Sequence, residues 1–331
     1  MSVYLVYAFD YPHNYYCDFI LRYEKVLELL EEHPEISKQY KVIKPGKLEM
    51  EQLKILHDEF YLKRLEEISK KDEKIREALL IDLLGVSGTL SACELSLQEK
   101  GVTYHLGGGF THASKDKESA FDYLNDIGIA VEWLRKKHGL KKIMIINLDV
   151  HHADGIQKLF YHDRGVMQIS FHGWNIFPGT GDVNEIGEGE GKGYKINLPF
   201  LAGTSDETYL WAMDVIIPKY SKLFKPEFII YQAGVDCLLR DPLGNLKLTL
   251  EGVYERDKKI RDFFKNSPLV IIRGGGYNNE YSPKANLNTL ACFANLPIVY
   301  KHGKKISEPK KCRKWAEKKL EELEKLLAEY W

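Results

Sequence analysis

Short runs rich in Val, Ile and aromatic residues alternate along the chain with longer segments of helical periodicity. Runs of this length and composition are typical of buried strands. The runs expected to form strands are Val3–Ala8, Val102–Leu106, Lys142–Leu148, Val166–Phe171, Tyr194–Leu198, Phe228–Ala233 and Leu269–Arg273.

Between these runs, apolar residues recur at helical spacing. The segments expected to form helices are Phe19–Glu32, two short pieces within Lys47–Lys71, Val86–Gln98, Ser119–Lys137, Ser205–Leu223 and Leu250–Phe264. Strands separated by helices predict an α/β fold with a mostly parallel sheet that helices cover on both faces. We expect one domain over residues 1–331. Glu308–Tyr330 has apolar residues along one side, which favours a helix that caps this domain over one that binds a partner.

Composition excludes several classes of protein. The chain has 331 residues, with 47 Lys and Arg against 48 Asp and Glu, a net charge of −1, so no nucleic-acid partner is expected. The five cysteines form no CxxC pair, which favours reduced thiols and a cytoplasmic location. The N-terminus does not resemble a signal peptide, and no run approaches the ~18 apolar residues of a membrane span.

Glycine and polar residues follow four of the predicted strands. The segments are Gly107–His112, Asp149–Asp154, Gly234–Asp241 and Gly274–Tyr277. Ligands of open parallel α/β sheets gather outside the carboxyl ends of the strands. The four segments are therefore predicted to face one crevice.

Asp149 and His151 stand two residues apart after a strand, so an extended backbone places both side chains on one face. A carboxylate and an imidazole are ligands that zinc accepts, although ferrous iron accepts them too. Asp241 and Asp236 are both candidates for the third ligand. Asp241 is favoured because it precedes Pro242, where the backbone is extended. Both acids are alternatively ordinary loop residues that bind backbone N–H groups.

His112 follows three glycines, which bring a backbone close to a ligand. One histidine with a pKa near 7 can take a proton from a metal-bound water and return it to a leaving amine. Asp154 either holds the far nitrogen of this ring or caps the next helix, and the sequence pattern alone favours the cap. Tyr277 either donates to an oxyanion or packs behind its glycine turn. Phe121 and Phe177 either wall a narrow passage or belong to the core.

Together these segments resemble the histone deacetylase and acetylpolyamine amidohydrolase superfamily. The matching stretches follow the order of that family: GGGFTHA (107–113), AFDYLNDIGIAVEWL (120–134), INLDVHHADGIQKLF (146–160), VMQISFHGWNIFPGTGD (166–182), NEIGEGEGKGYKINLP (184–199), QAGVDCLLRDPLGNLKLT (232–249) and GGGY (274–277). One matching stretch alone would be weak evidence for the family, whereas seven stretches in the same order are specific evidence.

The resemblance implies an arginase-like fold and a set of site residues. The implied zinc ligands are Asp149, His151 and Asp241. The implied acid–base pair is His112 with Asp154. Tyr277 becomes the oxyanion donor. The substrate tunnel is implied to include Phe121, Phe177, Ala120, Gly275 and, at its rim, Leu248. A structural potassium or sodium ion is implied beside the zinc, bound by Ser170 and by the carbonyls of Asn147, Asp149, His151 and Phe171. Arg22 stands near where the family places an arginine behind the site.

The chain departs from the family pattern at one histidine–aspartate dyad. Thr111 stands where the family has the first histidine of a pair, and Asn147 where it has the aspartate that binds that histidine. An aspartate left without its partner in a dry site is costly, so a paired change indicates a re-tuned site. Two smaller departures are Asp122, where many members carry cysteine, and Ala120, where they carry glycine.

The sequence thus predicts a zinc-dependent amidohydrolase that removes an acetyl or other acyl group from a lysine-like amine. An acyl-lysine peptide, an acetylpolyamine and another small amide are all open as substrates, and the oligomeric state is not predicted. One alternative is a non-catalytic protein that binds acyl-lysine or metal. Another is a dinuclear manganese ureohydrolase, which is disfavoured because Ala153 stands where its second metal needs an aspartate.

Overall fold

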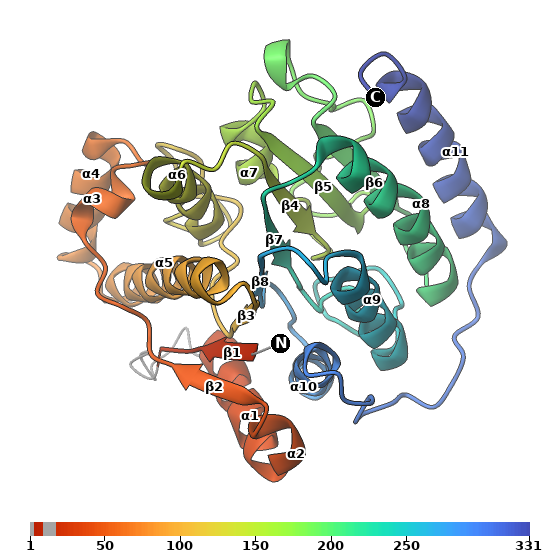
Figure 1. Cartoon of the computed structure of the whole chain (residues 1–331), viewed down its shortest axis with the longest axis horizontal. Coiled ribbons are helices and arrows are strands. Elements are labelled where there is room, and N and C mark those ends of the chain that lie inside the picture. Colours follow the sequence, from red (N-terminus) through yellow and green to blue (C-terminus); the bar gives the residue numbers. More distant parts are fainter. Residues whose placement is uncertain (1–2, 9–17) are drawn as a thin grey trace.

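Eight parallel strands form the centre of the protein in the part of the chain that the structure describes (Figure 1). This computed structural model describes the backbone of residues 3–8 and 18–331, and the side chains of residues 3–8 and 23–331. The sheet order is β2-β1-β3-β8-β7-β4-β5-β6. The strands are β1 Val3–Val6, β2 Tyr40–Ile43, β3 Val102–His105, β4 Ile143–Asn147, β5 Val166–Gly173, β6 Lys195–Phe200, β7 Phe228–Gln232 and β8 Leu269–Ile272.

Helices cover both faces of this sheet (Figure 1). One face packs against α1 Asp18–Glu32, α8 Asp206–Phe224, α9 Leu250–Phe263, α10 Tyr281–Phe293 and α11 Lys310–Leu327. The other packs against α3 Met50–Leu53, α4 Glu59–Ser69, α5 Glu73–Glu99, α6 Asp126–His138 and α7 Asp154–Leu159. Two short pieces, α2 Pro34–Ser37 and the 3-10 turn Gly189–Gly191, complete the described helices.

The central strand β4 shows why the apolar runs form this sheet. Met144 and Ile146 lie in one hydrophobic cluster, and Ile143 and Ile145 lie in the other. Successive side chains of a strand point to opposite faces, so a strand covered on both faces must be apolar throughout. The predicted α/β fold with a helix-covered parallel sheet is confirmed.

Among the described elements that the sequence pattern did not predict are β2 and α10. β2 lies at the sheet edge, where Lys41 and Val42 are exposed, so it lacks a continuous apolar run. α10 is buried on nearly all sides, including Asn286 and Asn288. A helix without a solvent-exposed face shows no amphipathic period.

Two predicted helix boundaries were wrong. α5 begins at Glu73, well before the expected Val86. α6 begins at Asp126, because the Asn125 side chain accepts the N–H of Gly128 and caps the helix there. The residues before it form a loop in which Ala120 (φ 53°) and Phe121 (φ 67°) adopt left-handed conformations that a helix does not allow.

One described helix, α5, is long and apolar enough to cross a membrane by length and composition alone. Half of its most apolar window is buried inside the protein. Core helices pass the same test, so this finding is weak evidence for a membrane segment.

The C-terminal helix α11 lies against β6 and α8. The indole N–H of Trp315 donates to the carbonyl of Pro199 at 3.0 Å. The Lys319 ammonium binds the Asp182 carboxylate at 2.7 Å, in the loop after β5. The helix therefore covers the sheet edge formed by β6.

Candidate active site

The four glycine-containing segments meet at one edge of the sheet. They follow β3, β4, β7 and β8, which are neighbours in the order β3-β8-β7-β4. The Gln232 amide donates to the Gly109 carbonyl at 3.2 Å, and the N–H of Gly275 donates to Asp149 Oδ2 at 2.7 Å. The predicted convergence of the four segments is confirmed.

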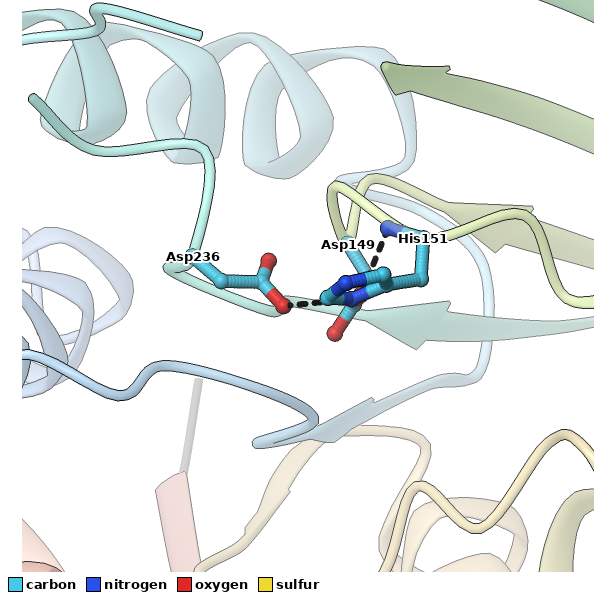
Figure 2. A group of neighbouring side chains, drawn as sticks. All are labelled: Asp149, His151 and Asp236. Carbon is cyan, nitrogen blue, oxygen red and sulfur yellow. Dashed lines mark hydrogen bonds and ion pairs between the residues drawn. The ribbon is translucent and has the colours of Figure 1, made fainter. Parts of the chain in front are cut away.

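Asp149, His151 and Asp236 form a compact group where these segments meet (Figure 2). His151 Nδ1 lies 3.2 Å from Asp149 Oδ1 and 3.1 Å from Asp236 Oδ2. One ligand atom from each residue lies within 4.8 Å of the other two, and all three residues are buried. Within the described part of the chain, this is the group of side chains arranged to hold a metal ion.

Glycines allow the surrounding backbone to approach this group. A β-carbon at Gly234 would lie 2.2 Å from Asp149 Oδ2, and one at Gly275 would lie 2.3 Å from Asp236 Oδ2. Real side chains do not tolerate such contacts, so both positions require glycine. Gly275 is thus placed against the acidic group, where its N–H binds Asp149.

The electrostatics of the group favour a bound cation. Burial, followed by the charge of Asp149, raises the pKa of Asp236 to about 7. Burial would also raise the pKa of Asp149, but hydrogen bonds from His151 outweigh it and lower that pKa to about 2. The two carboxylates overcome the burial of His151 and raise its pKa to about 11. The acids therefore hold a proton on His151, and a divalent ion would displace it. Carboxylate and imidazole donors fit zinc.

Asp241 lies beside this group but is engaged differently. Its carboxylate accepts the N–H groups of Tyr277 (2.7 Å) and Asn278 (3.2 Å), together with those of Leu243 (3.0 Å) and Gly244 (3.2 Å). Burial raises the pKa of Asp241, and its charge in turn raises the pKa of Asp236, so the two acids are near neighbours. The third ligand stays a prediction, with Asp241 implied by the resemblance and Asp236 by the compact group.

The oxygens implied for a monovalent cation are partly occupied. The Asn147 side-chain amide donates to the His151 carbonyl at 2.9 Å and to Ser170 Oγ at 3.0 Å. Phe171 is fully buried in the core on the same strand as Ser170. The Oδ1 atom of the same Asn147 amide is buried without a hydrogen-bond partner. The potassium or sodium site therefore stays a prediction.

His112 and Asp154 form a hydrogen-bonded pair beside the acidic group. His112 Nδ1 lies 2.8 Å from Asp154 Oδ1, and the two side chains are 14% and 5% exposed. The helix that begins at Asp154 receives no side-chain cap, so the alternative role as a helix cap is wrong. Burial opposes ionisation of Asp154, but hydrogen bonds from His112 and Lys158 outweigh it and lower its pKa. The carboxylate therefore stays charged and orients the imidazole.

Aromatic rings flank the two histidines. The Phe177 ring lies 5.0 Å from the His112 ring and 6.2 Å from the His151 ring, and Tyr277 lies 6.2 Å from His151 on another side. Phe177 is 49% exposed and Phe121 is 71% exposed, so neither is a core residue. The exposed Phe177 ring therefore lies beside both histidines, and the predicted passage stays a prediction.

Two predicted tunnel residues differ in placement. Ala120 is exposed and shares the left-handed backbone of Phe121. Leu248 is fully buried in the hydrophobic core, and its N–H and C=O bind Cys237 and Leu239. The prediction that Leu248 lies at an open rim is wrong, because this backbone pairing draws its side chain inward. Arg22 lies outside the described side chains.

The side chain of Asp122 holds the backbone of His112. Its carboxylate accepts the N–H of His112 at 2.9 Å. Burial and the neighbouring Asp82 raise the pKa of Asp122 well above its usual value. A cysteine, which many family members carry here, is a weaker acceptor for this N–H.

A buried arginine that was not predicted from the sequence lies beneath the site. The guanidinium of Arg256, on α9, donates to the carbonyls of Gly234 (2.6 Å), Ala233 (3.2 Å) and Leu148 (3.3 Å). It is fully buried and paired with Asp257 at 2.9 Å. It therefore ties the loops after β4 and β7 together. The sequence feature that could have revealed it is the charged pair Arg256 and Asp257 on the apolar side of a predicted helix.

The altered dyad leads to a prediction about paired substitutions. Thr111 is 2% exposed, and Asn147 is fully buried. A histidine at position 111 without an acid at position 147 puts an unpaired imidazole in a closed site. We expect Thr111→His with Asn147→Asp to keep a higher melting temperature and kcat than Thr111→His alone. A single variant that is at least as stable and active contradicts this coupling.

Comparison with known proteins identifies the family of this chain. A model of the family described as "Histone deacetylase domain" matches residues 20–292. The chain is 32% identical over 261 residues to "Probable histone deacetylase 1-B" of Xenopus laevis, covering 73% of this chain and 54% of that protein. It is 40% identical over 200 residues to "Histone deacetylase 9" of Arabidopsis thaliana, covering 60% of this chain and 46% of that protein. The chain spans about half the length of these relatives. It belongs to the histone deacetylase family.

Proposed function

We propose that this chain is a zinc-dependent amidohydrolase that removes an acetyl or other acyl group from a lysine-like amine. The observation that carries the proposal is the His112–Asp154 pair beside the group of Asp149, His151 and Asp236. Membership of the histone deacetylase family supports amide hydrolysis. Asp149, His151 and Asp241 would hold the zinc ion, with Asp236 as the rival third ligand.

We favour Asp241 because an open coordination position needs access from the crevice. Asp149, His151 and Asp241 retain 5%, 9% and 7% exposure, whereas Asp236 is fully buried. The Asp236 carboxylate also accepts the backbone N–H of Val150 at 2.7 Å. A ligand set that borders the opening leaves room for water and substrate.

Bound zinc would polarise the scissile carbonyl and lower the pKa of the attacking water. Asp154 holds Nδ1 of His112, which leaves Nε2 to accept the proton of that water. The same nitrogen then donates the proton to the amine as it leaves. Asp154 steadies the ring while it is charged. Because Thr111 replaces the other family histidine, His112 serves as base and acid in turn.

Tyr277 is the proposed donor to the oxyanion. Its backbone N–H is fixed on Asp241, and its ring lies beside His151. Tyr277→Phe is expected to lower kcat by about 100-fold, as removal of one oxyanion donor does. Zinc content should not change. Unaltered turnover would remove this tyrosine from the reaction, and lost zinc would make it a structural residue.

The proposed substrates are an acyl-lysine peptide and an acylated small amine such as an acetylpolyamine. The exposed rings of Phe121 and Phe177 favour an apolar methylene chain at the opening. The net charge of −1 gives no preference for a basic protein tail. A panel of acyl-lysine peptides and acetylated polyamines, assayed on zinc-loaded and iron-loaded protein, tests the substrate class and the metal together.

The altered dyad favours one second candidate, a protein that binds acyl-lysine without hydrolysing it. Such a protein would bind an acetyl-lysine peptide with zinc in place and release no acetate. Hydrolysis by the wild-type chain excludes this candidate.

A further inference from the structure

Asp154 binds a third residue in addition to His112. Asp154 Oδ1 binds His112, and Asp154 Oδ2 binds the Lys158 ammonium at 2.6 Å. Asp154 is the first residue of α7, and Lys158 is one turn later on the same face. The two oxygens of one buried carboxylate thus join the imidazole on one side to a cation on the other.

We propose that Lys158 is a positioning residue for the reaction: it holds the outer oxygen of Asp154 so that the inner oxygen stays on His112. The inference rests on the proposed function of His112 as the acid–base group. Lys158 does not contact the metal-binding group, so its effect passes through Asp154.

Burial separates this pair from an exposed helical ion pair of the same spacing. Lys70 and Glu66 have the same spacing and the same 2.6 Å distance, but both are more than 60% exposed. Asp154 is 5% exposed, whereas Lys158 is 61% exposed. Exposed pairs are screened and contribute little. A buried carboxylate depends far more on each of its partners.

Lys158 reaches Asp154 from the surface that lies behind the acid–base pair. A cavity of about 330 Å³ lies there, lined by residues that include Asp154, Gln157, Lys158, Tyr161, Thr180 and Glu185. The nearby acid Glu185 is already bound by the Gln157 amide at 2.6 Å. Lys158 is the cation of this lining that binds Asp154.

Loss of the ammonium leaves Asp154 Oδ2 to water at the wall of this cavity. The carboxylate is then free to rotate, and the imidazole loses its fixed orientation. Substrate binding should hardly change, because Lys158 faces the cavity behind the pair. The expected signature is a fall in kcat with little change in KM.

The experiment compares Lys158→Met, Lys158→Arg and Asp154→Asn, together with the double variant Lys158→Met/Asp154→Asn, on an acetyl-lysine peptide. Lys158→Met should lower kcat by about 3- to 10-fold, the size expected for one ordinary hydrogen bond, because the Lys158 ammonium is largely exposed and screened by solvent, with KM within about twofold. Lys158→Arg should restore most of the rate. With Asp154→Asn already present, Lys158→Met should have no further effect. Lys70→Met is the matched control and should behave as the wild type.

A second readout does not depend on turnover. In protein labelled with ¹⁵N-histidine, the Nδ1–H signal of His112 should be sharp in the wild type and in Lys158→Arg, and broadened in Lys158→Met. A wild-type kcat and a sharp signal in Lys158→Met would overturn the inference, as would a loss of rate that persists without Asp154. If the wild type hydrolyses no substrate, the proposed function fails, and the signal still decides the role of Lys158.

Discussion

Replacing His112 by alanine is expected to lower kcat by at least about 100-fold, the lower end for a general acid–base residue. The imidazole is the proposed carrier of both proton transfers, and Asp154 fixes its orientation from 2.8 Å. Thr111 stands where the family has the other histidine of the His-His pair, so no neighbouring imidazole is present at position 111 to compensate. Steady-state kinetics on zinc-loaded protein measure the effect.

The matched control for this variant is His138→Ala. His138 is the last residue of α6 and binds Glu94. It comes just before β4 begins, near the amino ends of the strands, whereas the site lies at their carboxyl ends. His138→Ala should leave kcat unchanged. A His112→Ala variant that retains a near-wild-type rate would show that another group carries the proton.

Removing a metal ligand should abolish both zinc binding and turnover. Asp149 belongs to both possible ligand sets, so Asp149→Ala is expected to weaken zinc binding by more than about 100-fold, the upper limit for loss of an outer-shell contact. Zinc content after dialysis against a weak chelator measures this loss. The remaining activity should fall in proportion to the metal.

Asp236→Asn and Asp241→Asn then decide the third ligand. We expect Asp241→Asn to lose zinc as Asp149→Ala does. Asp236→Asn should keep zinc and lower the melting temperature, because its carboxylate binds Val150 and His151. Zinc lost from Asp236→Asn and retained by Asp241→Asn would transfer the role to Asp236.

The sequence predicted the parts of the site that depend on strand ends. The carboxyl ends of parallel strands share one edge of a sheet, so His112, Asp149 and Tyr277 had to converge once their strands were recognised. The alternation of apolar runs and helical segments likewise predicted the parallel sheet. Both predictions rest on backbone periodicity, which a single sequence displays.

Other features depend on contacts that periodicity does not encode. The loop before α6 is set by left-handed residues such as Phe121 and by the cap at Asn125. The inward turn of Leu248 follows from its pairing with the segment around Leu238. Nothing in the sequence pattern distinguishes Lys158 from other lysines, because its proposed role depends on how deeply its partner Asp154 is buried.

Hydrolysis of a fluorogenic acetyl-lysine peptide, before and after removal of metal, tests the central claim most directly. We expect turnover by the wild-type chain, loss of turnover after treatment with a chelator, and recovery when one equivalent of zinc is added. Turnover that survives complete removal of metal, or none at all from protein shown to hold zinc, would contradict that claim.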